Sequence, residues 1–193
     1  MVTDLGNDVF IDFEPDEFQL NGWAKFHQVP RSPVSGMHAQ TRVQGSAPTF
    51  GVAIDGSDIV VTRVQGRIRI ARGQTWVVTG RETPELLEHE QGHYYITYIP
   101  YVLALQSIRS LQVPVAQAHI PRGASAHQQQ TLMHNAVVRH IQPILTQSQS
   151  RMTQLTSQYD TATPPGTNHG INRPQQQQWN QRFAQSLANG TAL

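Results

Sequence analysis

The chain has 193 residues, the length of one domain or at most two small ones, and hydrophobic residues make up 38% of it, enough to build a core. Charged residues are only 14% and the formal net charge is +1, which argues against a nucleic-acid-binding surface. Cysteine is absent, so disulfides and thiolate sites are excluded, and a transition metal would need His, Asp or Glu ligands.

The first 80 residues predict strands and turns. Short runs of β-branched side chains alternate with loops that contain Gly or Pro, and Asp55-Gly56 is a dipeptide typical of tight hairpins. The expected strands are residues 9–13, 59–64, 67–70 and 76–79, with Gly66 between the second and the third. Together they indicate an antiparallel or mixed sheet.

Residues 83–188 predict mainly helix. Thr83 is a good N-cap and Pro84 suits the first helical position. This helix should run to about Tyr98, because Pro100 ends or kinks a helix, and a further helical stretch is expected up to Leu111.

Two more helices are expected downstream. Ser125 caps a long amphipathic pattern that ends at Tyr159-Asp160, in which Pro143 should cause a kink or a break and His140 is expected to pack in the core. A last short helix is expected over residues 174–188. One face of it carries Trp179, Phe183 and Leu187.

The motif that carries chemistry is His89-Glu90-Gln91-Gly92-His93, which has the pattern H-E-x-x-H. Two histidines at i and i+4 lie on the same face of a helix and can bind one Zn²⁺. The carboxylate of Glu90 is then placed to take a proton from a water molecule, as the general base and later the acid of a metal-dependent hydrolase.

A catalytic zinc usually has three protein ligands. No glutamate follows Glu90, and the only later acid is Asp160, so the third ligand must be that residue or a downstream histidine. The downstream histidines are His119, His127, His134, His140 and His169.

The segment Leu86–His93 and the aromatic residues after it resemble the H-E-Q-G-H-F-D-I stretch of a bacterial family of predicted secreted zinc-dependent proteases, a zincin-like domain. That family has a second signature, Y-D-x-x-T-x-H-G followed by Q and W. The matching pieces here are Tyr159-Asp160, Thr167-Asn168-His169-Gly170, Gln175 and Trp179, and an early W-x-x-F is matched by Trp23 and Phe26.

The second signature aligns in two ways. Without a gap, Thr163 takes the threonine position and Pro165 replaces the histidine; with a gap, His169 is that histidine, and Asp160 matches in both. The resemblance thus implies Asp160 as third metal ligand, with His169 as its rival. In the first case His169 would stabilise the oxyanion, and in the second Asp160 would orient a ligand imidazole. Tyr159 is a weaker oxyanion candidate.

We therefore expect an α+β fold, with residues 1–193 forming a single zincin-like metalloprotease domain. The resemblance implies that an N-terminal mixed or antiparallel sheet packs on the HExxH helix and that C-terminal helices close the cleft. It also implies that an edge strand, here residues 76–79 or 67–70, lines the substrate groove. The expected activity is zinc-dependent hydrolysis of peptide or protein substrates.

An alternative function is a metal-binding or accessory module without proteolytic activity, in a secreted or surface assembly. The resemblance implies a secreted or periplasmic location, although the sequence shows no signal peptide. No apolar run is long enough to span a membrane.

Overall fold

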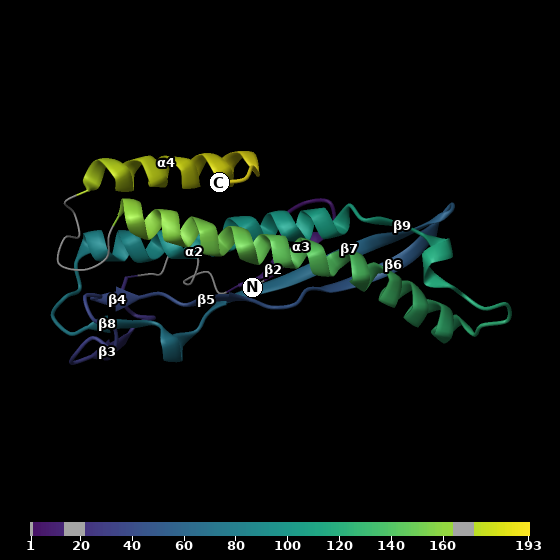
Figure 1. Ribbon diagram of the computed structural model, residues 1–193, viewed down its shortest axis with the longest axis horizontal. Coiled ribbons are helices and arrows are strands. Elements are labelled where there is room, and N and C mark those ends of the chain that lie inside the picture. The colour runs from purple at the N-terminus through teal and green to yellow at the C-terminus, as the bar shows by residue number, and fades with distance from the viewer. Residues whose placement is uncertain (1, 14–21, 164–171) are drawn as a thin grey trace.

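A computed structural model describes residues 2–13, 22–163 and 172–193, and it shows an elongated α+β fold (Figure 1). Two long helices, α2 (Pro84–Arg109) and α3 (Ala126–Ala162), lie side by side along a mixed sheet. A third helix, α4 (Arg173–Asn189), packs against both at one end of the molecule. The expected fold class is confirmed at the level of α+β with a mixed sheet.

The larger sheet is built around the long strand β7 (Asp58–Ile70). It pairs antiparallel with β5 (Val43–Gly45), β6 (Thr49–Asp55) and β9 (Gln112–Pro114), and parallel with β2 (Val9–Asp12), which itself pairs with β1 (Val2–Asp4). The hairpin predicted at Asp55-Gly56 joins β6 to β7, and Gly56 has the positive φ of 60° that its tight turn requires.

A bulge in β7 sets which of its side chains face the helices. Adjacent residues of the partner strand β6 pair with Arg63 and then with Val61 of β7. Thr62 is therefore an extra residue in β7. Buried positions accordingly change phase at this point, from Ile59 and Val61 before the bulge to Val64, Ile68 and Ile70 after it.

The prediction of two strands at 59–64 and 67–70 is wrong, since β7 is continuous through Gly66. This glycine makes room for the helix above it. A Cβ there would lie 2.6 Å from both the Tyr101 hydroxyl and the Leu105 Cδ1 of α2. Glycine in this strand therefore marks a close approach of another element.

The smaller sheet lies under the N-terminal end of α2 (Figure 1). Its order is β3 (His27–Val29), β8 (Trp76–Val78) and β4 (Ala39–Gln40), so β8 is the central strand. The short 3₁₀ helix η1 (Arg72–Gln74) joins it to β7.

The first long helix begins where the sequence predicts and ends later. Thr83 caps α2 by accepting a hydrogen bond from the backbone of Leu86, but the helix passes through Pro100. An interior proline costs about 3 kcal/mol, whereas burial of one large apolar side chain contributes about 1.5–3 kcal/mol. Beyond the proline, Tyr101, Leu105 and Ile108 are each at most 4% exposed, so their packing outweighs the loss.

The two later helices also differ in detail from their prediction. Ser125 and Gln128 form a capping box at the start of α3, which remains one helix through Pro143 and ends at Ala162. In α4, Trp179 and Phe183 are buried as expected. Leu187 is 37% exposed, however, and the preceding Ser186 takes the inward position. The 3₁₀ helix η2 (Val115–Ala118) precedes α3.

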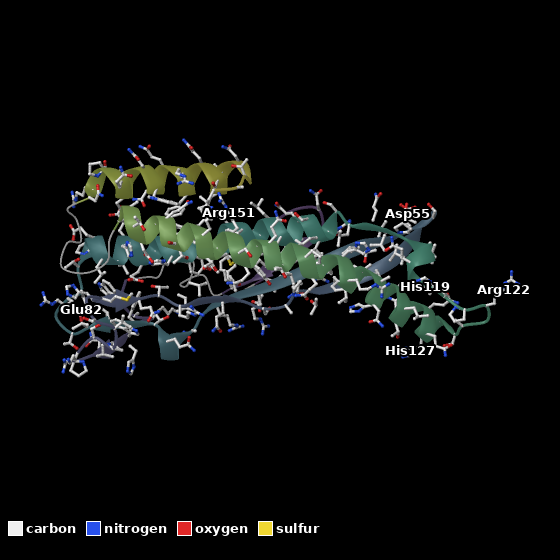
Figure 2. All side chains as sticks on the ribbon, viewed as in Figure 1. Asp55, Glu82, His119, Arg122, His127 and Arg151 are labelled. Atoms are coloured by element: carbon white, nitrogen blue, oxygen red, sulfur yellow. The ribbon has the colours of Figure 1, made fainter. Side chains whose placement is uncertain are left out.

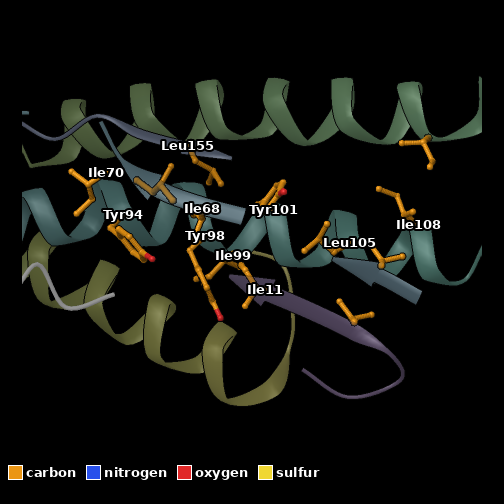
Figure 3. Close-up of a cluster of buried hydrophobic side chains, with 14 of the residues drawn as sticks. Ile11, Ile68, Ile70, Tyr94, Tyr98, Ile99, Tyr101, Leu105, Ile108 and Leu155 are labelled. Carbon is orange, nitrogen blue, oxygen red and sulfur yellow. The ribbon is translucent and has the colours of Figure 1, made fainter. Parts of the chain in front are cut away.

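The main core lies between β7 and α2 and continues to α3 and α4 (Figure 3). His140 is not part of it, contrary to expectation. Its ring is half-buried and its Nε2 lies 2.9 Å from Gln117 Oε1, so a polar partner near η2 holds it at the surface of α3. None of the helices in the described ranges is long and apolar enough to cross a membrane.

Gly66→Ala tests the contact between β7 and α2. The new methyl group would overlap the Tyr101 and Leu105 side chains, so we expect a loss of about 1–3 kcal/mol in the free energy of unfolding, measured by urea denaturation. Gly73→Ala is the matched control, because a Cβ there meets nothing within 4 Å. Equal stability of the two variants would contradict the packing described.

Candidate metal centre

Two histidines of α2 form one side of the site. His89 and His93 are one helical turn apart, and their Nε2 atoms lie 3.1 Å from each other. His89 is only 1% exposed, and the two rings are nearly perpendicular, at 82°. Both nitrogen lone pairs can therefore be directed at one point.

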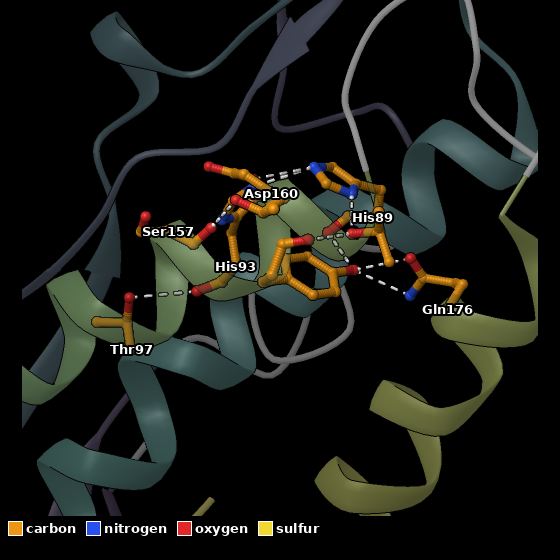
Figure 4. Close-up of polar contacts among 9 residues, drawn as sticks. His89, His93, Thr97, Ser157, Asp160 and Gln176 are labelled. Carbon is orange, nitrogen blue, oxygen red and sulfur yellow. Dashed lines mark hydrogen bonds and ion pairs between the residues drawn. The ribbon is translucent and has the colours of Figure 1, made fainter.

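Asp160, in the last turn of α3, completes the cluster (Figure 4). Its Oδ1 lies 3.2 Å from the Nε2 of His93 and 3.6 Å from the Nε2 of His89. Two ligands on a tetrahedron with metal bonds of about 2.0–2.1 Å are about 3.3 Å apart. The three separations, 3.1, 3.2 and 3.6 Å, surround this value, so the donor set fits one transition-metal ion.

Thr163 fixes the protonation pattern of His89. The Thr163 hydroxyl donates its one hydrogen to the Tyr159 carbonyl at 2.7 Å, and His89 Nδ1 lies 3.1 Å from the same oxygen. Because that hydroxyl can then only accept, Nδ1 of His89 must carry the proton. Nε2 keeps its lone pair, which is the form of imidazole that binds a metal.

Tyr159 holds α3 against α2 behind the two histidines. Its ring stacks on His89 with centroids 4.8 Å apart, and its hydroxyl donates to the His89 carbonyl at 3.0 Å. The hydroxyl also lies 2.9 Å from Nε2 of Gln176, a residue of α4. This approach requires Gly92, where a Cβ would be only 2.2 Å from the Tyr159 hydroxyl.

The charged forms of His93 and Asp160 stabilise each other. Burial disfavours the charged form of His93, but the hydrogen bond with Asp160 and the negative charges of Glu90 and Asp160 outweigh it and raise the pKa of His93. Burial likewise disfavours ionised Asp160, yet its close contacts with the imidazoles of His89 and His93 keep its pKa well below the ordinary value. Asp160 is thus ionised at neutral pH, as a metal ligand must be.

Glu90 is 1% exposed, and its Oε2 is buried without a hydrogen-bond partner among the residues that the structure describes. A buried carboxylate oxygen without a partner costs free energy, so an external partner is expected there. Glu90 lines a cavity of about 160 Å³ together with His89, His93 and Asp160. Its carboxylate therefore belongs to the same small chamber as the three candidate ligands.

The structure brings together His89, Glu90, His93 and Asp160, which the sequence singled out. His169 lies outside the described residues. His119 and His127 lie at the end of the elongated molecule far from this cluster (Figure 2). His134 is exposed, and its ring stacks on Phe50. The Tyr159 hydroxyl is committed to His89 and Gln176, so it is not available to an oxyanion.

Sequence reasoning did not assign a supporting role to the residues that hold the ligands in place. Thr163, the C-cap of α3, follows Asp160 by three residues, and this spacing was a signal that the two lie on the same side of the helix end. In α4 the residue that reaches Tyr159 is Gln176, whereas the resemblance pointed to Gln175. No local pattern marked Thr41, which also lines the small chamber.

A groove of about 1080 Å³ leads from the metal cluster along α3. One wall is the face of α3 from Gln142 to Thr161, and the other is formed by β5 and its flanks, residues 42–47. The expectation that residues 76–79 line the groove is wrong, because β8 is a central strand. Residues 67–70 lie behind β5, which separates them from the groove.

On the side of β5 that faces away from β7, backbone N–H and C=O groups can pair with another extended chain. Among the described strands, only β7 pairs with β5. Arg42 and Ser46 bond through their backbones to β7 and the residue that follows it. Because such bonding alternates along an antiparallel strand, Val43 and Gly45 turn their N–H and C=O groups to the opposite side.

Comparison of the chain with models of known protein families gave no match, and neither did comparison with curated proteins or with solved structures. The similarity to the zinc-dependent protease family therefore rests on the motifs described above.

Thr163→Val tests the support of His89. Valine has the shape of threonine without the oxygen that accepts from Nδ1, so we expect zinc affinity to fall about 10- to 100-fold, measured by competition with a chromophoric chelator. Thr163→Ser keeps the hydroxyl and should bind zinc nearly as the parent does. Unchanged affinity in the valine variant would show that this contact does not orient the ligand.

Proposed function

We propose that the protein is a zinc-dependent peptidase in which His89, His93 and Asp160 hold the metal and Glu90 is the general base and acid. The observation that carries the proposal is the buried carboxylate of Glu90 in the same chamber as the three candidate ligands. A purely structural metal site would have no use for this second carboxylate, whose Oε2 has no partner among the described residues.

The donor set supports zinc. Two imidazole nitrogens and one carboxylate oxygen leave one tetrahedral position open, which is the arrangement of catalytic zinc sites. The same three donors also suit Fe(II) in oxygen-dependent enzymes. The unpaired Glu90 beside the ligands favours hydrolysis, since proton transfer from water needs a carboxylate at this place.

Glu90 performs the proton transfers of the proposed reaction. Its carboxylate takes a proton from the water that attacks the scissile carbonyl carbon, and it then passes that proton to the amine nitrogen as the C–N bond breaks. Zinc, when bound, would supply a Lewis acid that polarises the carbonyl and makes water more acidic. The nearly complete burial of Glu90 strengthens these interactions by excluding bulk water.

The groove supports an extended polypeptide as substrate. From Gln142 to Asp160 the α3 wall is about 27 Å long, at 1.5 Å per residue, which corresponds to about eight residues of extended chain. The backbone groups of Val43 and Gly45, which point away from β7, are placed to pair with such a chain as an added strand. Because Arg42 and Asp160 are the only charged residues among those that line the groove, side chains of the substrate away from the metal should be uncharged.

Glu90→Gln tests the proposed reaction. The amide has the shape of the carboxylate but cannot accept the proton, so we expect cleavage of denatured casein to fall about 10²- to 10⁴-fold while one zinc per chain is retained. Chelator treatment of the parent should abolish cleavage and added zinc should restore it.

The alternative of a metal-binding module without activity predicts a different result. In that case the parent protein would bind zinc and cleave neither casein nor gelatin. A glutamine variant that cleaves as fast as the parent would exclude the proposed role of Glu90.

A further inference from the structure

Thr41 carries a second unpaired polar atom in the chamber of the metal cluster. It lies between β4 and β5, and its Oγ1 is buried without a hydrogen-bond partner in the described part of the chain. The same cavity of about 160 Å³ is lined by Thr41 and by Glu90. The α2 wall thus offers an unpaired acceptor, and the opposite β4–β5 wall offers an unpaired hydroxyl.

The backbone on both sides of Thr41 is firmly held. Gln40 pairs with Trp76 in the smaller sheet, and its side-chain oxygen accepts from the Trp76 indole at 3.0 Å. Arg42 donates its N–H to the Thr75 hydroxyl at 3.0 Å. The Thr41 hydroxyl is therefore presented by a rigid segment, which is what a preorganised hydrogen-bond donor requires.

Two other hydroxyl groups near the site are already engaged. Thr97 lines the same cavity but donates to the His93 carbonyl at 3.2 Å. The Tyr159 hydroxyl is taken by the His89 carbonyl and Gln176. Glu90 and Asp160, being carboxylates, accept and do not donate when ionised. Among the described residues that line this chamber, Thr41 is the one whose buried side-chain donor has no hydrogen-bond partner.

We propose that Thr41 is a catalytic residue whose hydroxyl donates a hydrogen bond to the scissile carbonyl oxygen of the substrate. This role rests on the proposed peptidase function. As the water oxygen bonds to the carbonyl carbon, the π electrons of the C=O bond move onto the carbonyl oxygen, and one proton of the water goes to Glu90. Negative charge then develops opposite Glu90, where the Thr41 hydroxyl stabilises it. The hydrogen bond is released when the C–N bond breaks and the carbonyl re-forms.

Thermal unfolding of the zinc-free protein tests whether the hydroxyl is kept for a ligand. Thr41→Val replaces an unpaired buried hydroxyl by a methyl group of similar size, so we expect the melting temperature to rise by about 2–4 °C. A lower melting temperature would mean that the hydroxyl has a structural partner, and this would overturn the proposal. This measurement involves no hydrolysis, so its outcome does not depend on the proposed function.

Kinetics and inhibitor binding test the catalytic role. With a quenched fluorescent peptide taken from a casein cleavage site, kcat of Thr41→Val should fall about 10²- to 10³-fold with little change in KM. Thr41→Ser retains the donor and should recover most of the rate. Loss of rate through KM alone would overturn the assignment.

Binding separates this role from the peptidase function itself. The first measurement is the affinity of the zinc-loaded protein for a hexa-alanine phosphinic peptide, which mimics the tetrahedral state. The second is the affinity for hexa-alanine itself, measured in the Glu90→Gln protein so that the peptide is not cleaved. Thr41→Val should weaken binding of the phosphinic peptide by about the same factor by which it lowers kcat/KM. When it is added to the Glu90→Gln protein, the affinity for hexa-alanine should be unchanged. Equal phosphinic-peptide affinity in parent and variant would overturn the role of Thr41 and leave the peptidase function standing, whereas a parent that hydrolyses nothing would refute the peptidase function and with it this role.

Discussion

The arrangement depends on the contact between Tyr159 and Gly92. The tyrosine is fully buried, and its hydroxyl occupies the space where a side chain at position 92 would start. This brings the last turn of α3 onto the second turn of α2, so that two segments about 70 residues apart in sequence meet at one point. Gly92 therefore has a packing role inside the motif, in addition to separating the two histidines.

The same contact positions the candidate metal ligands. Tyr159 and Asp160 in the last turn of α3 and the C-cap Thr163 each contact His89: through ring stacking, through Oδ1, and through the hydroxyl at Nδ1. Trp179 and Phe183 of α4 pack on the other edges of the tyrosine ring, with centroids 5.3 and 5.9 Å away. The stability of the helical layer and the geometry of the candidate metal site are therefore coupled, since neither can change without moving this ring.

Local patterns in the sequence predicted the parts of the site that are local in structure. His89, Glu90 and His93 share one helical turn, and the Thr83 cap and Pro84 fixed where that helix begins. Asp160 was found because it is the only acid after Glu90 and matches the family signature. Long-range pairing determined the rest: nothing near Thr41 in sequence shows that it lines the same cavity as Glu90. For the same reason Gly66 indicated a break between strands, although it accommodates Tyr101 of a distant helix.

The most direct measurement is the zinc content of untagged protein combined with X-ray absorption at the zinc edge. We expect one zinc per chain, with two imidazole nitrogens and one or two oxygens in its coordination shell. Asp160→Asn should lower zinc affinity by at least about tenfold, whereas His169→Asn should leave it unchanged. Zinc that binds equally well to His93→Asn protein, or a coordination shell without imidazole, would contradict the metal centre described here.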